Sequence, residues 1–359
     1  MADSKQAPLD AAAAAKAAFA SVQDKPFPND IFTAPELRWA VIGCGVIANQ
    51  MAQSLALAGR KLTGVANRTL TKAQTFADRY GVEKVYDTVE DLYADPDIDA
   101  VYITTPHNTH ITYLRAALAA GKHVLCEKAI TLNSAELDEA RAIAAEHNVV
   151  LMDATTVLHM PLYQELRRRM DAGEFGRMNL AQLNFGSYKE YGDLTNRFYN
   201  RNLAGGAMLD IGVYALSVMR LFMASQPVEV VSLGNTCETG VDVAGGIVCR
   251  NAEQQLGVVS LTLHSKQPKR SVISFDNCYV EVNEYPRADH ATIVWTADGH
   301  REEVAAGTEA YALCYEMADL EQAVAGDDSK RQLLDYASDV MELMTKLRAD
   351  WGVVYPEEE

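Results

Sequence analysis

The sequence lacks the features that would mark a membrane, secreted or metal-binding protein. It contains no apolar run near the ~20 residues of a membrane span. Its 6 cysteines include no C-x-x-C pair, and no histidine stands at metal-ligand spacing. The alanine-rich start, residues 1–20, carries charges and lacks a basic segment before a long apolar core, so it makes a poor signal peptide. We therefore expect reduced cysteines, no bound metal and a cytoplasmic protein.

Basic residues are scarce as well. The chain has 32 Lys+Arg against 49 Asp+Glu, which gives a formal net charge of −17 at pH 7. This balance would repel both nucleic acid and an anionic membrane, so neither is expected as the main partner. A local basic pocket for a phosphate remains compatible with it, and we expect a small-molecule substrate.

The order of apolar and helical segments divides the chain into three parts. At 359 residues it is too long for most single cores. Residues 1–35 form an extension, and residues 36–154 alternate short apolar strands with helices, which predicts a Rossmann domain with a parallel sheet. Residues 155–359 contain consecutive strand-like runs and a few helices. They predict an α+β domain with a large, mainly antiparallel sheet, whose C-terminal helices could pack back on the first domain.

A glycine-rich turn follows the first predicted strand. Gly43, Gly45 and Ala48 form G-x-G-x-x-A between the apolar segment 37–42 and a predicted helix. The first glycine allows a tight turn, the second lets a pyrophosphate approach the backbone, and the alanine allows close packing of helix on strand. The free N–H groups of the helix start favour phosphate. This position predicts a dinucleotide site.

The end of the second predicted strand bears on the type of cofactor. An acidic residue there usually holds the ribose 2′-hydroxyl of NAD. The chain instead has Asn67, Arg68, Thr69 and Lys72, with no acid. A guanidinium can hold a 2′-phosphate in a bidentate contact, so NADP(H) is favoured. If Arg68 is an ordinary exposed loop residue, NAD(H) is possible too.

Polar residues follow two further strands, and a third group stands on a predicted helix. The turn 105–110 and the pair Glu127 and Lys128 lie beyond the carboxyl ends of neighbouring strands, where ligands of this architecture bind. Asp210 and Tyr214 are spaced i, i+4 and so share one helix face. A nearby ammonium would lower the pKa of the tyrosine and let it exchange a proton with a hydroxyl or carbonyl. The alternative is that Tyr214 is a core residue and Asp210 a helix cap.

These motifs together resemble those of the Gfo/Idh/MocA oxidoreductase family over residues 37–352. Tyr214, where many members have His, resembles the branch of dimeric dihydrodiol dehydrogenases and glucose–fructose oxidoreductases. The resemblance implies that Lys128 lies beside the nicotinamide and the substrate hydroxyl, that Asp210 contacts the substrate and that Tyr214 is the acid/base. It also implies a homo-oligomer, dimer or tetramer, formed through an open C-terminal sheet. The residues assigned to the cofactor site are Gly43, Gly45, Val46, Ile47, Ala48, Asn67, Arg68, Thr69, Lys72, Thr105, Pro106, His107, Asn108, His110, Glu127 and Lys128.

The chain departs from the family pattern at four positions. Ala129 replaces the proline of the E-K-P motif, and His107 replaces an asparagine. Asp153 and Leu158 stand where the entry to the second domain has Glu and Arg. Alanine relaxes the backbone after Lys128, since proline fixes φ, but it removes no chemical group. Substrate identity is therefore what these departures put in question.

A polar and aromatic loop, residues 188–206, precedes the helix that carries Asp210. Rings and guanidinium groups of this kind suit the apolar face and the hydroxyls of a sugar. A solvated loop with one or two structural pairs is the alternative. The residues assigned to the substrate site are Lys128, Tyr191, Arg197, Arg201, Asp210 and Tyr214.

The sequence therefore predicts an NAD(P)-dependent dehydrogenase or reductase acting on a secondary hydroxyl or carbonyl of a sugar, polyol or cyclic diol. Two alternatives stay open. One is a redox-assisted glycosidase that keeps NAD(H) tightly bound and shows no net cofactor turnover. The other is a non-catalytic nucleotide sensor, against which the retention of Lys128, Asp210 and Tyr214 argues.

Overall fold

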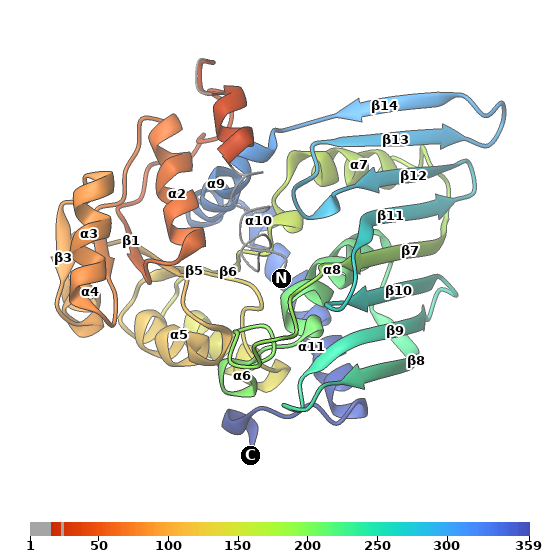
Figure 1. Ribbon diagram of the computed structural model, residues 1–359. Helices are drawn as coiled ribbons and strands as arrows, with labels where there is room; N and C mark the ends of the chain where they lie inside the picture. The colour runs from red at the N-terminus through yellow and green to blue at the C-terminus, as the bar shows by residue number, and fades with distance from the viewer. Residues whose placement is uncertain (1–15, 23–24) are drawn as a thin grey trace.

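Two sheets and the helices between them make up the molecule. The computed structural model describes residues 16–22 and 25–359. A six-stranded sheet A belongs to the N-terminal half and an eight-stranded sheet B to the C-terminal half, as Figure 1 shows.

Sheet A is parallel throughout and has the strand order β3-β2-β1-β4-β5-β6. Its central strands are buried along their whole length because helices cover both faces, which is why they read as continuous apolar runs. The parallel Rossmann sheet expected from the sequence is confirmed, although β3 was not expected. The strands are β1 (Trp39–Ile42), β2 (Gly64–Ala66), β3 (Lys84–Tyr86), β4 (Ala100–Ile103), β5 (His123–Cys126) and β6 (Leu151–Asp153).

The helices of this half follow the strands in turn. They are α2 (Val46–Leu57), α3 (Leu70–Tyr80), α4 (Val89–Ala94), α5 (His110–Ala119) and α6 (Ser134–Glu146). A helix from the end of the chain, α9 (Ala312–Val324), joins them, since its Leu313, Met317 and Leu320 share one apolar cluster with Val41 and Leu125 of sheet A.

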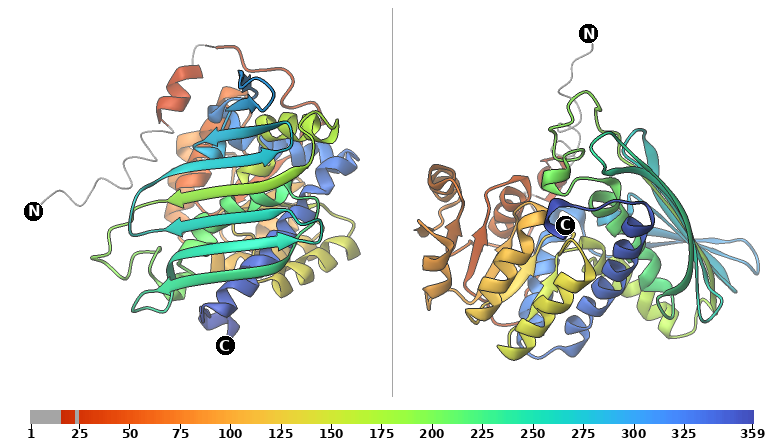
Figure 2. Two further views of the ribbon diagram at one scale, coloured as in Figure 1. Left: turned by 90° about the vertical axis from the view of Figure 1, so that its right-hand side faces the viewer. Right: turned by 90° about the horizontal axis from the view of Figure 1, so that it is seen from below.

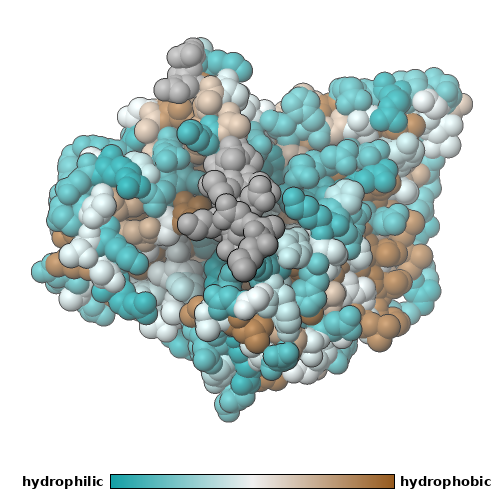
Figure 3. Space-filling model, viewed as in Figure 1, coloured by the Kyte–Doolittle hydropathy of each residue, from teal (hydrophilic) through white to brown (hydrophobic). Residues whose placement is uncertain are grey.

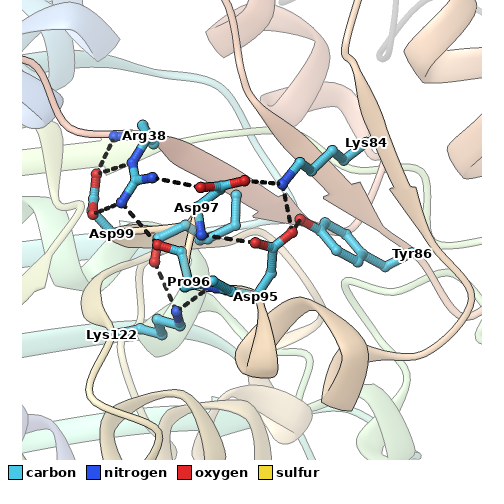
Figure 4. Close-up of polar contacts among 9 residues, drawn as sticks. Arg38, Lys84, Tyr86, Asp95, Pro96, Asp97, Asp99 and Lys122 are labelled. Carbon is cyan, nitrogen blue, oxygen red and sulfur yellow. Dashed lines mark hydrogen bonds and ion pairs between the residues drawn. The ribbon is translucent and has the colours of Figure 1, made fainter.

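Charged side chains tie together the amino ends of the strands of sheet A, opposite the edge where ligands bind in such sheets (Figure 4). The Arg38 guanidinium makes two hydrogen bonds to Asp99, at 2.9 and 2.7 Å, and one to Asp97 at 3.0 Å. The ammonium of Lys122, 7% exposed, donates to two main-chain carbonyls at 2.7 Å each. Lys84 pairs with the same acidic loop. This network fixes the sheet without using any of the residues assigned to the site.

Sheet B has the order β14-β13-β12-β11-β7-β10-β9-β8. All its pairs are antiparallel except β7–β10, so the expectation of a large, mainly antiparallel sheet is confirmed. The strands are β7 (Met178–Gly186), β8 (Pro227–Thr236), β9 (Asp242–Asn251), β10 (Leu256–Thr262), β11 (Gln267–Phe275), β12 (Cys278–Asn283), β13 (His290–Trp295) and β14 (Arg301–Ala305).

Helices cover one face of sheet B and leave the other uncovered, as the two views of Figure 2 show. The stretch 201–222 passes a length and hydropathy test for a membrane span, but 78% of its most apolar window is buried, as in the core helix of a folded domain. A single helix was expected over 206–223; a π-helical turn, Met208–Gly212, precedes α8 instead. The other helices of this half are α7 (Pro161–Asp171), α8 (Val213–Phe222), α10 (Asp328–Arg331) and α11 (Leu333–Asp350).

Candidate active site

The glycine turn has the backbone that a pyrophosphate site requires. Gly43 has φ +102°, and a Cβ there would lie 2.7 Å from the hydroxyl oxygen of Thr104. A Cβ at Gly45 would meet no atom within 4 Å, so a ligand can approach the backbone at this point. Gly45 caps α2 without a side-chain hydrogen bond, and Val46 is 72% exposed. The free N–H groups of the helix start are thus accessible, and the residues present fit a dinucleotide.

Cations gather where β2 ends and α3 begins. Arg68, Thr69 and Lys72 are all exposed, and the Asn67 amide closes the turn by donating to the Thr69 carbonyl at 3.0 Å. Lys72 also lines a hollow of about 210 Å³ between α2 and α3, together with Arg79. Arg79 was not singled out from the sequence, because its position thirteen residues after the end of β2 has no local signal and only the packing of α3 on α2 brings it there.

Lys128 and Asp210 meet across the two domains. The Lys128 ammonium donates to the Asp210 main-chain carbonyl at 2.7 Å and lies 3.2 Å from the carboxylate oxygen Oδ1. Burial disfavours the ammonium, but Tyr214 and Asp210 outweigh this effect and raise the pKa of Lys128. Burial alone would raise the pKa of Asp210, yet Lys128 and Arg197 hold it well below its usual range. Both groups are therefore charged at neutral pH.

Tyr214 completes a group of three side chains. The Lys128 ammonium lies 4.8 Å from the centre of the Tyr214 ring, so the helix of the second domain and the strand end of the first converge as the spacing predicted. Burial raises the pKa of Tyr214, and Lys128 opposes this rise without cancelling it. Lys128 thus lowers the pKa of the tyrosine as expected, but desolvation of the phenolate outweighs the attraction of one ammonium and the net shift is upward.

Hydrogen bonds from other elements hold the π-helical turn that carries Asp210 and the residues just before it. The buried carboxylate of Asp242 accepts a hydrogen bond from the Met208 main-chain N–H at 2.6 Å. The Tyr355 hydroxyl donates to the Gly205 carbonyl at 2.7 Å. Gly206 fits between them, since a Cβ at this residue would lie 2.3 Å from Asp242 Oδ1. The turn is wider than an α-helix, and Asp210 and Tyr214 both lie close to Lys128.

Of the two histidines in the turn 105–110, His110 supports the backbone and His107 lies nearer the site. Both ring nitrogens of the buried His110 face main-chain carbonyls, that of Ala129 at 3.0 Å and that of Thr105 at 2.8 Å. Neither is left for a ligand, so His110 braces the segment after Lys128. His107 lies closer to the site; burial, with the neighbouring His110 and Lys128, lowers its pKa to about 3, so its ring is neutral. Pro106 is exposed.

Ala129 stands where the family motif has proline. It is fully buried, and its carbonyl accepts the hydrogen bond from His110. The Lys128–Ala129 peptide bond is cis. Burial and the hydrogen bond to His110 therefore hold the backbone at Ala129, although the proline is absent.

A group of buried acids lies behind Lys128. Tyr102 donates a short hydrogen bond to Glu127, whose pKa is raised by burial. Burial raises the pKa of the buried Glu316 to about 8, and the negative charge of Glu127 adds to this rise. Arg287, which donates to Gln50 of α2 at 3.2 Å, exerts its positive charge on both glutamates. None of Tyr102, Glu316 and Arg287 was singled out from the sequence, since each comes from a different element.

The substrate loop contributes some of its expected residues and not others. Arg197 lies 3.5 Å from Asp210 Oδ1, within the site. Tyr191 packs edge-on against Tyr199 and His264, with ring centres 5.1 and 4.9 Å apart. Arg201 turns away, donating to the Val354 carbonyl at 2.7 Å. It is therefore not brought to Lys128, Asp210 or Tyr214.

The segment 355–359 clamps elements of both domains. Glu357 accepts a hydrogen bond from Asn108 at 2.7 Å, so this asparagine faces the clamp. Glu358 binds the buried Arg348 at 2.7 and 2.9 Å, and Glu359 pairs with Arg201. The clamp thereby ties the turn 105–110 to the substrate loop.

The described residues contain no group of three or more His, Cys, Asp or Glu side chains arranged to hold a metal ion, and the six cysteines are unpaired. The side chains that the structure brings together beyond the end of β5 are a lysine, an aspartate and a tyrosine.

Comparison with known proteins identifies both halves of the chain. A model of the oxidoreductase family with an NAD-binding Rossmann fold matches residues 37–155, and one of the GFO/IDH/MocA C-terminal domain matches residues 163–281. Trans-1,2-dihydrobenzene-1,2-diol dehydrogenase of Mus musculus is 32% identical over 244 residues, which cover 66% of this chain and 72% of the mouse protein. The Sus scrofa enzyme of the same name is 27% identical over 341 residues, covering 90% and 99% of the two chains.

Solved structures share the fold along most of the chain. A 3-ketoreductase from Actinomadura kijaniata in complex with NADP and TDP-benzene has a TM-score of 0.75 at 25% identity, covering 88% of this chain and 98% of the other. An NAD-binding oxidoreductase from Klebsiella pneumoniae has a TM-score of 0.79 at 21% identity, covering 89% and 99%. The two-domain architecture, the glycine turn and these relationships lead to one conclusion: the chain is an NAD(P)-dependent dehydrogenase of the Gfo/Idh/MocA oxidoreductase family.

Proposed function

We propose that this dehydrogenase interconverts a secondary hydroxyl and a carbonyl on a sugar, polyol or cyclic diol. The observation that carries the proposal is that Lys128, Asp210 and Tyr214 come together beyond the carboxyl end of β5. The Lys128 ammonium lies 2.7 Å from the Asp210 carbonyl oxygen and 4.8 Å from the centre of the Tyr214 ring. The dihydrodiol dehydrogenases and the 3-ketoreductase among the relatives act on substrates of this kind.

In this proposal Tyr214 moves the proton. During oxidation its oxygen accepts the hydroxyl proton of the substrate, and during reduction it returns that proton to the carbonyl oxygen. Lys128 stabilises the phenolate form and Asp210 fixes the lysine, since the ammonium has both the carbonyl and the carboxylate of Asp210 as partners. The nicotinamide, when bound, accepts or supplies the hydride.

We further propose that NADP(H) is the preferred cofactor, with NAD(H) as a possible one. Exposed Arg68 and Lys72 stand at the carboxyl end of β2, where no acid would repel a 2′-phosphate. Arg79, which lines the same hollow as Lys72, adds a third cation to the same region. The relatives do not decide the preference, because the 3-ketoreductase was solved with NADP and a levoglucosan dehydrogenase with NADH.

The test is a panel of sugars, polyols and cyclic diols, assayed by nicotinamide absorbance with NAD⁺ and NADP⁺ in parallel on the wild-type chain and on Tyr214→Phe. The variant should lose turnover by about 10²–10⁴-fold while binding NADPH as the wild type does. Unchanged turnover would remove Tyr214 from the mechanism. Glycoside cleavage without net cofactor turnover would favour the redox-assisted glycosidase. Cofactor binding with no reaction on any substrate would favour the sensor.

We propose that two copies of the chain associate through the uncovered face of sheet B. Val231 and Leu233 of β8 are 75% and 83% exposed, and Val248, paired with Val231 across the sheet, is 48% exposed. Figure 3 shows apolar residues gathered over this part of the sheet. An apolar face of this kind on a folded protein marks an interaction site. Sedimentation of the wild type should show a dimer or tetramer, and Leu233→Lys should dissociate it because the new charge disfavours the apolar contact. A wild-type monomer would contradict the proposed association.

A further inference from the structure

The loop that enters the π-helical turn presents two cations over one aromatic ring. The Lys189 ammonium lies 4.2 Å from the centre of the Phe198 ring, and the Arg197 guanidinium carbon lies 4.4 Å from the same centre. Within residues 16–22 and 25–359, the Lys189 ammonium has no hydrogen-bond acceptor, and Arg197 reaches only Asp210 Oδ1, at 3.5 Å. Most of the donors of both side chains are therefore unused.

The charges around Asp210 do not balance. Its Oδ1 is shared by Lys128, at 3.2 Å, and Arg197. Lys189 also acts on Asp210, so three cations face this carboxylate; the other acid that acts on Lys128 is Glu127, and the balance of these groups stays positive. The neighbouring Lys269 does not change this count, because it pairs with Glu284 at 2.7 Å. This local excess is the opposite of the formal net charge of −17 carried by the whole chain.

Lys189 is poorly neutralised where it stands. Burial lowers its pKa; Asp210 opposes this, and the positive charges of Arg197 and Lys128 add to it. A half-buried ammonium without an acceptor forgoes the charge-assisted hydrogen bonds that such groups make in proteins. Arg197 is 62% exposed at its side chain, so a ligand can reach the pair from solvent.

We propose that the substrate carries an anionic group, a carboxylate or a phosphate, which Lys189 and Arg197 bind while the reacting hydroxyl or carbonyl lies at Tyr214. The inference rests on the proposed function and narrows its substrate class to acidic polyols or sugars. An ammonium and a guanidinium that both lie within 4.4 Å of one ring centre match an anion that accepts from both.

The cofactor phosphates are not the partners of this pair. The glycine turn and the start of α2 offer the pyrophosphate its N–H groups, and Arg68 and Lys72 stand where a 2′-phosphate would lie. Both places are on the first domain, whereas Lys189 and Arg197 follow β7 of the second domain and are beside Asp210.

The test measures binding by calorimetry on the full chain saturated with NADP⁺. The probes are D-glucose, D-glucuronate and D-glucose 6-phosphate, so that the two anions separate a carboxylate from a phosphate site. At least one anion should bind about tenfold or more tightly than glucose, and this preference should fall about tenfold in Lys189→Met and in Arg197→Met. Lys189→Arg should restore it. Lys346→Met, which removes an exposed cation of α11, should behave as the wild type.

Equal affinity for glucose and for both anions would overturn the inference, and so would a preference that survives both methionine variants. Weaker NADPH binding by Lys189→Met, with the preference among sugars unchanged, would assign the pair to the cofactor and also overturn it. Because binding is measured without turnover, the inference and the proposed function can fail separately. Tyr214→Phe should lose turnover and keep the anion preference.

Discussion

The ammonium of Lys128 holds Asp210 at two points, its main-chain carbonyl at 2.7 Å and its carboxylate at 3.2 Å. A residue at the end of a strand in one domain thus fixes a helical turn of the other domain. The same ammonium faces the Tyr214 ring, so one side chain makes the contact between the domains and, in the proposed mechanism, also assists the proton transfer.

Opposite shifts of the pH profile are expected from Lys128→Met and Asp210→Asn. Lys128 lowers the pKa of Tyr214 and Asp210 raises it. Oxidation needs the phenolate, so its rate rises with pH through the tyrosine pKa. Loss of the lysine should move this rise to higher pH and reduce turnover by about 10²–10⁴-fold. Loss of the aspartate charge should move it to lower pH. Initial-rate pH profiles at saturating NADP⁺ measure both, and shifts of the same sign would contradict the proposed roles.

The preference for NADP⁺ over NAD⁺ should depend on Arg68. In this proposal Arg68 makes a charge-assisted hydrogen bond to the 2′-phosphate of NADP⁺, which NAD⁺ lacks. Arg68→Ala should therefore lower the ratio of kcat/KM with NADP⁺ to kcat/KM with NAD⁺ by about 10–100-fold. Arg79→Ala tests whether the third cation contributes. Arg115→Ala is the matched control, since this residue pairs with Glu139 on the exposed side of α5 and should leave the ratio unchanged. A ratio that Arg68→Ala does not alter would mean that the residue is an ordinary exposed one.

The pair Arg348–Glu358 should matter for stability. Arg348 is 2% exposed, and its replacement by methionine leaves the Glu358 carboxylate without its main partner. We expect a loss of about 3–5 kcal/mol in the free energy of unfolding, read by urea titration. The exposed pair Arg250–Glu229 is the control, and Arg250→Met should cost under about 1 kcal/mol.

The same pair predicts a pH dependence of stability. Burial would raise the pKa of Glu358, but Arg348 outweighs it and holds the pKa below its ordinary value. The folded state therefore releases this proton more readily than the unfolded chain does. The stabilisation is present above the ordinary carboxyl pKa and is lost as the pH falls through the lowered one. Unfolding curves of the wild type between pH 7 and pH 3 should converge on those of Arg348→Met, and a constant difference would contradict the assignment.

Gly206 should not tolerate a side chain. A Cβ would lie 2.3 Å from Asp242 Oδ1, and φ is +126°, which L side chains rarely adopt. Gly206→Ala should therefore displace the turn that carries Asp210, lowering both the melting temperature and kcat. Gly246→Ala is the control, because a Cβ there meets nothing within 4 Å. If Gly206→Ala melted as the control does and kept its turnover, the close approach would not constrain the turn.

Much of this architecture was readable in the sequence. Alternating apolar strands and helices predicted the parallel sheet, since each buried strand needs helices on both faces. The glycine turn predicted where a dinucleotide binds, because a tight turn and a close backbone approach both require the absence of a Cβ. The helical spacing of Asp210 and Tyr214, with Lys128 at a strand end, placed the three reactive groups together.

Only the tertiary structure decided what surrounds those groups. The pKa of Tyr214 is raised because packing desolvates it more than Lys128 attracts its phenolate, and desolvation depends on residues distant in the sequence. Arg201 binds the Val354 carbonyl and not the site, since contacts 153 residues apart leave no periodic signal. The excess of positive charge around Asp210 likewise emerges only when Lys189 and Arg197 fold over one ring. The local sequence pattern thus determined the helices and strands and the polar side chains that they carry. Long-range packing decided the protonation of those side chains and the direction in which they point.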